Sequence, residues 1–501
     1  MIRDLISRTG KISSDNPAIV AVLIALSCLM AYAIAVTPIK YGLFALGAII
    51  ISGILLLSLI NYKLPFYLAI FVAFGFSFVS KSMFYFFRMR ELQLGTVVDV
   101  LLYLSVIALF LNQSGNKYRL GKFSFNLLNV AILVQLLYLI IQAFNPNLLG
   151  MKGYLFGFRR ELSLLCVFIF AYYASKDRDF TNRLLWLWIA LATIAAIYGL
   201  WQQFIGFNRV DRFFIMYKWV IEGRMPFYHA GFMRMFSLFS DPTTFGMFLA
   251  PAAIFSFVYS NLVKSRKLKV LLFVSALLMI GGVVVSGTRT AYVMVVASIA
   301  LYLMMTMNNK RTIIISSILL FGFMYLLYGP VGNNYYVERV RSGFIGSDDE
   351  SLALRDYKRN ATQSYMYSQP LGGGINTTGH FGAKYSPDHY LTNYIIDSGY
   401  LKLGLETGWI GLLLLLFFYY SFLKVGLSVF YRCPDKEARL VTLGFIVGNF
   451  GLFISQYAQK SISQLPAGIF LFASFAIVSR YYDHFVKKLN TDKKNQTSKL
   501  A

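Results

Sequence analysis

The sequence predicts an all-α polytopic membrane protein with about 12–14 transmembrane helices and a large, partly helical extracytoplasmic loop. Composition is the first reason: 57% of the 501 residues are hydrophobic and 14% are charged, whereas soluble domains carry roughly 25% charged residues. The second reason is a long series of apolar windows, each near the roughly 17–25 residues that cross a bilayer. The third is that basic residues gather in the short loops that follow every second window.

Fourteen apolar windows are candidate membrane helices, and the count falls to twelve if short neighbours are fused. They cover residues 17–37, 41–60, 64–80, 96–112, 124–143, 160–174, 183–201, 242–260, 268–286, 290–306, 312–328, 400–425, 438–456 and 464–480. The alternating pattern of an outer-membrane barrel is absent. The polar, basic residues 1–16 are not expected to form a cleavable signal. The three cysteines are too scattered for a disulfide framework or a metal motif.

The basic loops also predict the sidedness of the chain. With Arg3, Arg8 and Lys11 in the cytoplasm, the loops after even-numbered spans are cytoplasmic, and all of them are basic. The net charge of +25 then follows from the positive-inside rule and does not indicate a nucleic-acid partner. The expected organisation is a cytoplasmic segment 1–16, a transmembrane bundle 17–328 with an outer loop at about 202–241, a large outer loop 329–399 with catalytic elements, C-terminal transmembrane helices 400–480, and a basic cytoplasmic tail 481–501.

Arginine dominates the basic residues that this topology leaves outside. A planar guanidinium binds phosphate through two hydrogen bonds and is less strongly hydrated than an ammonium group, so an outer arginine cluster favours a site for an anionic, membrane-held substrate. Ordinary contacts with lipid headgroups are the alternative for each arginine taken singly. The outer arginines are Arg88, Arg90, Arg159, Arg160, Arg209, Arg212, Arg224, Arg234, Arg289, Arg355 and Arg359.

Arg289 stands in "VVVSGTRTAYVMVVA", at a short polar hinge between two hydrocarbon runs. A charge in mid-bilayer costs about 3 kcal/mol or more, so an interface position or an anionic partner is expected for it. In "RMFSLFSDPTTFG", Asp241 and Pro242 fit the N-cap and first position of a helix. Arg234 and Ser237 precede this helix, near the membrane surface.

The second outer loop predicts a short surface helix over residues 351–367, where apolar and polar residues alternate at helical spacing. Arg355 and Arg359, four residues apart, form one cationic stripe on this helix. "QPLGGG" then ends it. Gly373 and Gly374 permit a close backbone approach to a ligand, but no Lys-Ser/Thr follows, so the glycines are not a nucleotide phosphate loop.

The segment "DSGYLKLGLETGWIG" returns the chain to the membrane. Asp397 is either the N-cap of the following helix or a reactive carboxylate. Glu406 lies about one turn inside the membrane, where a lone carboxylate is costly, so we expect an outer arginine to pair with it.

Taken in order, these segments resemble the O-antigen ligase and O-antigen polymerase family of inner-membrane glycosyltransferases. The resemblance rests on "GYLFGFRREL", "RMFSLFSDPTTFG", "SGTRTA", the arginine-bearing loop helix, "PLGGGI" and "DSGYLKLGLETGWIG", over residues 150–411. It implies a multi-pass protein of the bacterial inner membrane with a periplasmic active site. The implied donor is a glycan linked to a polyprenyl diphosphate such as undecaprenyl diphosphate, and the implied acceptor is a hydroxyl of a glycan or lipid core.

The family's diphosphate-binding arginines map onto Arg159, Arg234, Arg289 and Arg355. Ligases of the family have histidine eleven residues before a Gly-x-x-Gly, and this chain has Asp397 there, as many polymerase-like members do. The departure favours polymerisation in O-antigen or exopolysaccharide synthesis over ligation to lipid A-core or transfer to protein. Membrane lipids, a flippase and a chain-length regulator are further expected partners, with no cofactor.

Glycosyl transfer from a lipid diphosphate needs a base for the acceptor hydroxyl and cations for the departing diphosphate. We expect Asp397 as the base, with His389 as the rival, and supporting roles for Ser237, Arg359, Glu406 and the two glycines. No carboxylate or histidine cluster predicts a metal, and no nucleophile for a covalent intermediate is evident, so a metal-independent inverting displacement is expected. A lipid or glycan transporter is the alternative outside enzymes, with Asp99 its clearest membrane-embedded acid.

Overall fold

The computed structural model describes residues 53–54, 57–58, 61–88, 94–114, 123–223, 225–229, 232–308, 310–330, 335–345, 350–462 and 464–487. The predicted span 17–37 and nearly all of 41–60 lie outside the described residues, as do segment 1–16 and most of the tail. Arg90 and Arg224 lie outside them as well.

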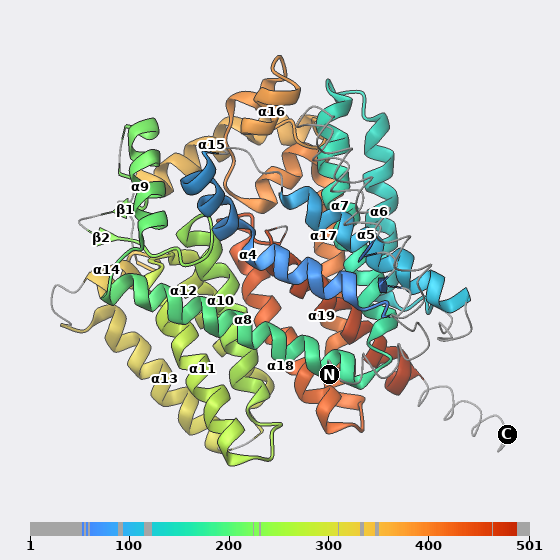
Figure 1. Cartoon of the computed structure of the whole chain (residues 1–501), viewed down its shortest axis with the longest axis vertical. Coiled ribbons are helices and arrows are strands. Elements are labelled where there is room, and N and C mark those ends of the chain that lie inside the picture. Colours follow the sequence, from blue (N-terminus) through green and yellow to red (C-terminus); the bar gives the residue numbers. More distant parts are fainter. Residues whose placement is uncertain are drawn as a thin grey trace, which may run out of the picture.

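The described chain is a bundle of helices, which confirms the predicted all-α fold class (Figure 1). Eight helical segments among the described residues are long and apolar enough to cross a membrane. They belong to α4 (Leu64–Phe87), α5 (Leu94–Ser114), α6 (Leu127–Ile141) with η1 (Gln142–Phe144), α8 (Arg178–Phe204), α10 (Pro242–Tyr259), α11 (Arg266–Val285), α17 (Gly399–Arg432) and α18 (Lys436–Ser455).

Four further helices coincide with predicted spans and are not among these eight. They are α7 (Met151–Ala174), α12 (Arg289–Met305), α13 (Lys310–Tyr328) and α19 (Ala467–Tyr481). Each predicted span from residue 64 onward therefore corresponds to a helix. A π-helical turn, η3 (Tyr482–Lys487), continues α19.

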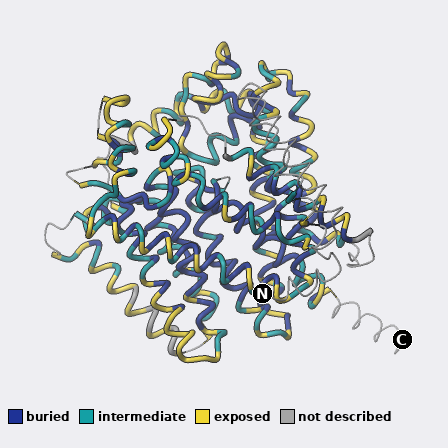
Figure 2. Tube along the Cα trace, viewed as in Figure 1, coloured by how far each residue is buried: buried dark blue, intermediate teal, exposed yellow. Residues whose placement is uncertain are grey.

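Helices α10 and α18 form the buried centre of the bundle (Figure 2). Small residues on α18 let the two helices approach closely: a Cβ on Gly448 would lie 3.2 Å from the carbonyl oxygen of Pro251 in α10. Gly444 faces Phe255 of α10 in the same way, and Gly451 faces Ser298 of α12. Close packing through small residues is typical of membrane helices, where lipid offers no hydrophobic driving force for association.

The two long loops of the prediction contain short elements of their own. The first holds α9 (Arg209–Glu222) and a hairpin of two-residue strands, β1 (Tyr228–His229) and β2 (Phe232–Met233). The second holds α14 (Tyr335–Arg341), α15 (Glu350–Ser368), α16 (Gly379–Tyr385) and η2 (Tyr390–Asn393). Helices α9, α15 and α16 lie at one end of the molecule (Figure 1).

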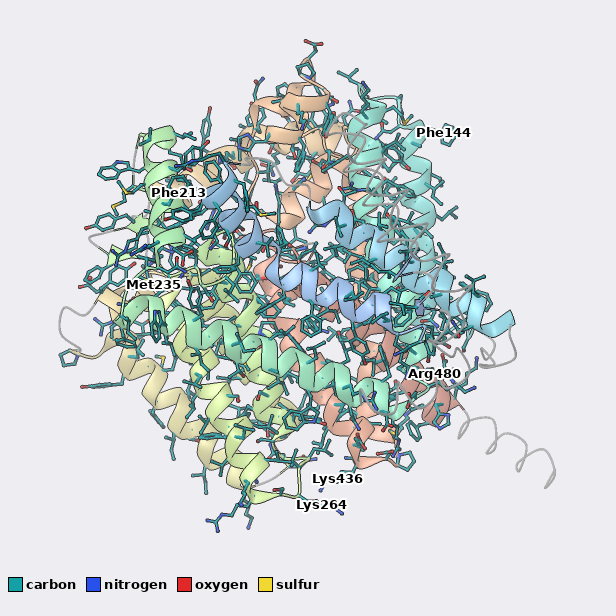
Figure 3. All side chains as sticks on the ribbon, in the orientation of Figure 1. Phe144, Phe213, Met235, Lys264, Lys436 and Arg480 are labelled. Carbon is teal, nitrogen blue, oxygen red and sulfur yellow. The ribbon has the colours of Figure 1, made fainter. Side chains whose placement is uncertain are left out.

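The opposite end carries loops that the charge pattern predicts to be cytoplasmic. Lys264 and Lys436 both lie there (Figure 3). Two of these loops are joined, because Arg178 forms an ion pair with Asp435 and lies 4.0 Å from Glu437. Predicted inner loops and predicted outer loops therefore occupy different ends of the bundle.

Candidate active site

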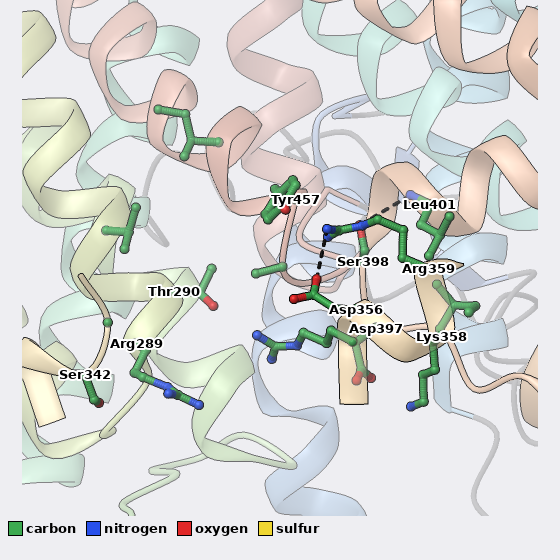
Figure 4. Close-up of a pocket in the computed structure, with 16 residues that line it drawn as sticks. Arg289, Thr290, Ser342, Asp356, Lys358, Arg359, Asp397, Ser398, Leu401 and Tyr457 are labelled. Carbon is green, nitrogen blue, oxygen red and sulfur yellow. Dashed lines mark hydrogen bonds and ion pairs between the residues drawn. The ribbon is translucent and has the colours of Figure 1, made fainter. Parts of the chain in front are cut away.

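A cavity of about 380 Å³ lies among the start of α12, the residues after α14, helix α15, the segment before α17 and the end of α18. Four cationic residues line it: Arg289 on α12 and Arg355, Lys358 and Arg359 on α15. Two carboxylates, Asp356 and Asp397, also line it, which leaves an excess of two positive charges. Figure 4 shows Arg289 and Asp397 on different walls of the cavity.

Helix α15 forms as predicted and turns its arginine stripe into the cavity. The Arg359 guanidinium bonds Asp356 at 3.1 Å and lies 4.8 Å from the ring centre of Tyr457 (Figure 4). The Nε of Arg355 is buried and has no hydrogen-bond acceptor in the described part of the chain. A buried donor without an acceptor costs about 1–3 kcal/mol, so Arg355 favours an oxygen-rich ligand.

Asp397 lies directly before α17 and is not its N-cap. Ser398 caps this helix by accepting a hydrogen bond from the Leu401 amide at 3.3 Å. Asp397 is exposed, and its carboxylate has no hydrogen bond or ion pair to another described residue. The backbone that follows Asp397 is held in place, because the amides of Gly399 and Tyr400 both bond to the Gln456 carbonyl. The carboxylate therefore lines the cavity without a hydrogen bond or ion pair to a described residue, and it interacts electrostatically with Lys460.

His389 lies outside the cavity. Its Nδ1 accepts a hydrogen bond from the Leu391 amide at 3.1 Å, and its ring packs against Gly373. Burial lowers the pKa of His389 below its ordinary value, and the nearby Glu406 carboxylate opposes this effect. The geometry of this histidine is that of a packed loop residue.

The glycine triplet packs against α17 and does not line the cavity. The Gly373 amide donates a 2.8 Å hydrogen bond to the Leu405 carbonyl, and the Gly374 amide donates one of 2.8 Å to the Glu406 carbonyl. A Cβ on Gly408, where α17 kinks at φ 71°, would lie 1.8 Å from the Pro370 carbonyl oxygen. The close backbone approach that the glycines permit is thus an approach to this helix.

Glu406 is buried, and its partner differs from the outer arginine that we expect from the sequence. Lys402, one turn earlier on α17, lies 3.5 Å away, and the Thr378 hydroxyl donates a hydrogen bond to the same carboxylate oxygen. This pairing stays within α17 and the loop that covers it, which places Glu406 outside the cavity lining. An i,i+4 lysine therefore supplies the positive charge that we expected from an outer arginine.

Arg234 lies at the α11–α12 hinge and does not line the cavity. Its Nε bonds the Ser286 carbonyl at 3.0 Å, and its Nη2 bonds the Thr288 hydroxyl at 2.9 Å. Burial and the neighbouring Arg339 lower the pKa of Arg234 to about 10. Arg234 supports the backbone that leads into Arg289.

Ser237 and Arg159 are likewise engaged elsewhere. Ser237 is fully buried, with its hydroxyl on the Ala195 carbonyl at 2.7 Å. Arg159 lies 3.0 Å from Asp99 of α5 and bonds Thr96 at 3.0 Å. Asp99 is thus paired within the bundle, and neither Ser237 nor Arg159 reaches the cavity.

The structure adds cavity residues that the sequence interpretation missed. Lys358 follows Arg355 by three residues on α15, so the helical spacing that reveals the arginine stripe also indicates this lysine. Tyr457 comes from the segment after α18 and carries no local signal. Asp241 behaves as predicted: it caps α10 by accepting a hydrogen bond from the Thr244 amide at 2.9 Å. The described residues contain no group of three or more histidine, cysteine or acidic residues that is arranged to hold a metal ion.

Comparison with known families bears on the same part of the chain. Residues 274–416 match the family model described as O-antigen ligase. The match runs from α11 through the hinge, the long loop and the kink of α17, and so includes Arg289, Arg355 and Asp397. No curated protein matches the chain. Residues 274–416 therefore carry an O-antigen ligase family domain, in agreement with the family resemblance seen in the sequence.

Proposed function

We propose that the protein transfers a glycan from a polyprenyl-diphosphate donor to an acceptor hydroxyl at the outer face of the bacterial inner membrane. The family domain implies a glycosyl-transferring enzyme of the O-antigen ligase and polymerase type. The observation that carries the finer proposal is one cavity that joins Arg289, Arg355 and Arg359 with the Asp397 carboxylate, which accepts no hydrogen bond from a described residue. Those residues come from three separate segments of the chain, which the fold brings together.

The charge and shape of the cavity support a lipid diphosphate as ligand. Arginine side chains bind phosphate oxygens through two hydrogen bonds, and the cationic excess suits a dianionic or trianionic group. Val293 of α12 and Ile454 of α18 add an apolar side to the same cavity. An apolar wall beside a cationic one fits a molecule whose charged head is attached to a hydrocarbon chain.

In the proposed reaction, the Asp397 carboxylate takes the proton of the acceptor hydroxyl as its oxygen attacks the anomeric carbon. The bond from that carbon to the diphosphate oxygen breaks, and the electron pair leaves with the diphosphate. Arg289 and Arg355 stabilise the charge that grows on the leaving group, an effect typically worth a few kcal/mol per fixed donor. A single displacement of this kind inverts the anomeric configuration.

Polymerisation is the acceptor chemistry that we favour, because aspartate replaces the ligase histidine eleven residues before Gly408. Ligation to a lipid core is the second candidate, since the matching family model is that of the O-antigen ligase. The glycan profile of a deletion strain distinguishes them. Single-unit glycans indicate a polymerase, whereas long polymer left on its lipid carrier indicates a ligase.

The proposed donor site is tested in the same strain by complementation with Arg289→Ala. We expect this variant to reach the membrane at the wild-type level and to fail in glycan assembly. Arg209→Ala is the matched control, because Arg209 begins α9 and does not line the cavity. Wild-type polymer from the Arg289 variant would contradict the proposed site.

A further inference from the structure

We infer that Arg339 is a positioning residue that fixes the hinge from which Arg289 reaches the cavity. The inference rests on the proposed function of Arg289 as a ligand of the donor diphosphate. It goes beyond that function because Arg339 does not line the cavity and comes from a different segment, the short helix α14.

The hinge has carbonyl groups that its helices cannot satisfy. Helix α11 ends at Val285, and the chain reverses at Gly287 with φ 58° before α12 begins at Arg289. The last carbonyls of α11 already have donors: those of Gly282 and Val284 accept the Ser286 and Gly287 amides, and that of Val285 accepts the Met235 amide. Ser286 and Gly287 follow the helix and are buried, so their carbonyls need donors from elsewhere in the protein, whereas the Thr288 carbonyl accepts the Ala291 and Tyr292 amides of α12.

Two arginines supply those donors from opposite directions in the sequence. Arg234 bonds the Ser286 carbonyl, and the Nε of Arg339 bonds the Gly287 carbonyl at 3.1 Å. Arg339 is 8% exposed, and its proximity lowers the pKa of Arg234. Two like charges held close together in the interior oppose folding, so the arrangement indicates that the hinge needs both donors.

The same helix also shapes the cavity wall beside Arg289. Ser342 and Gly343, which follow α14 directly, line the cavity. A Cβ on Gly343 would lie 3.6 Å from the Cβ of Arg289, so the two backbones are neighbours. The hydrogen bond from Arg339 to Gly287 therefore connects α14 to the hinge. It does so two residues before Arg289, the proposed ligand of the diphosphate.

Loss of this bond is expected to move Arg289 and to leave the other cavity residues in place. A displacement of about 1 Å in a catalytic group lowers turnover about 100-fold. The test measures donor KM and kcat for the full-length protein in nanodiscs, with the lipid-linked glycan extracted from the deletion strain. We expect Arg339→Gln to lower kcat/KM about 10- to 100-fold and Arg339→Lys, which retains a donor, to recover part of that loss.

Arg341 provides a matched control on the same helix. Its Nε bonds the Leu326 carbonyl of α13 at 2.8 Å and its Nη2 bonds the Gly329 carbonyl, so Arg341→Gln removes arginine–carbonyl bonds away from the hinge. We expect less than about threefold loss of kcat/KM from Arg341→Gln, because neither of its carbonyl partners belongs to the hinge that carries Arg289. Equal losses from the Arg339 and Arg341 variants would overturn the inference.

A double-mutant cycle separates this inference from the proposed function. If Arg339 acts through Arg289, then adding Arg339→Gln to Arg289→Ala does not lower the residual transfer rate measured in nanodiscs any further. A full additional loss in the double variant would mean that Arg339 acts independently, which overturns the inference while the proposed function stands. An Arg289→Ala variant with wild-type activity would overturn the proposed function itself. Thermal unfolding of each variant, within a few degrees of the wild type, shows that the comparison is made between folded proteins.

Discussion

Arg289 stands on a wall of the cavity whose backbone is buried and hydrogen-bonded by Arg234 and Arg339, whereas Arg355 and Arg359 stand on a loop helix. The other face of that helix, α15, exposes Leu354 and Tyr357. One cation is thus preset by the folding of the bundle, and the others depend on how the long loop docks. Fixed hydrogen-bond donors contribute most to catalysis when they need no rearrangement. The hinge wall, which carries Arg289, should therefore contribute more to recognition of the donor substrate than the loop wall, which carries Arg355 and Arg359.

Replacement of the Asp397 carboxylate should have the largest effect on activity. Asp397→Asn is expected to lower kcat by about 10²–10⁴-fold, because it removes the proposed base, with little change in donor binding. Single-turnover transfer with lipid-linked glycan provides the measurement. Asp356→Asn is the control, since Asp356 lines the same cavity but already bonds Arg359. Equal rates for the two variants would mean that the base lies elsewhere.

Substitutions of the arginines on the loop wall should have the next largest effect. Arg355→Ala should weaken donor binding about tenfold, and Arg359→Ala less, because Arg359 is already held by Asp356 and by the ring of Tyr457. Donor titration of both variants measures the difference. A larger loss from Arg359 than from Arg355 would reverse the assignment of the two arginines.

The hinge wall makes a prediction about stability. Arg234→Ala leaves the buried Ser286 carbonyl without its donor, which should destabilise the protein by about 1–3 kcal/mol. Thermal unfolding in detergent should therefore show a lower midpoint for this variant than for Arg212→Ala, whose guanidinium bonds an exposed loop carbonyl at Phe207. Similar midpoints for the two variants would weaken the claim that the hinge is held by its arginines.

The smallest expected effect is a pH dependence near Asp397. Burial, together with Lys402, lowers the pKa of Lys460 from 10.5 to about 8. Between these values the unfolded chain binds a proton that the folded protein does not, so stability should rise as pH increases from about 8 to 10.5. Lys460→Met should remove part of that rise in a pH series of unfolding midpoints. An unchanged slope would show that the lysine is charged in the folded protein.

Sequence patterns predict the helices and the α15 arginine stripe well, because apolar windows and i,i+4 spacing are local properties. They also identify Arg289 and Asp397, whose segments have local signatures. Sequence patterns do not predict contacts between residues that lie far apart in the chain. Arg234 and Ser237 look like surface residues near a helix start, but each bonds a segment that lies about 40–50 residues away in the chain.

Two contacts made by Glu406 and by the glycine triplet could not be predicted for a related reason. Glu406 pairs with Lys402 because the helix brings an i,i+4 lysine within reach, and the glycine triplet packs against the kinked α17. Nothing in the sequence shows that Gly408 breaks the helix there with a positive φ. Only tertiary contacts show that Tyr457 lines the cavity and that Arg339 bonds the hinge.

The most direct test of the central claim is binding of undecaprenyl diphosphate, without a glycan, to the full-length protein in nanodiscs. The wild type should bind it, and Arg289→Ala/Arg355→Ala should bind at least about tenfold more weakly, because two of the diphosphate's charge-assisted contacts are lost. Arg209→Ala should match the wild type. Equal affinity in all three proteins would contradict a diphosphate site in this cavity.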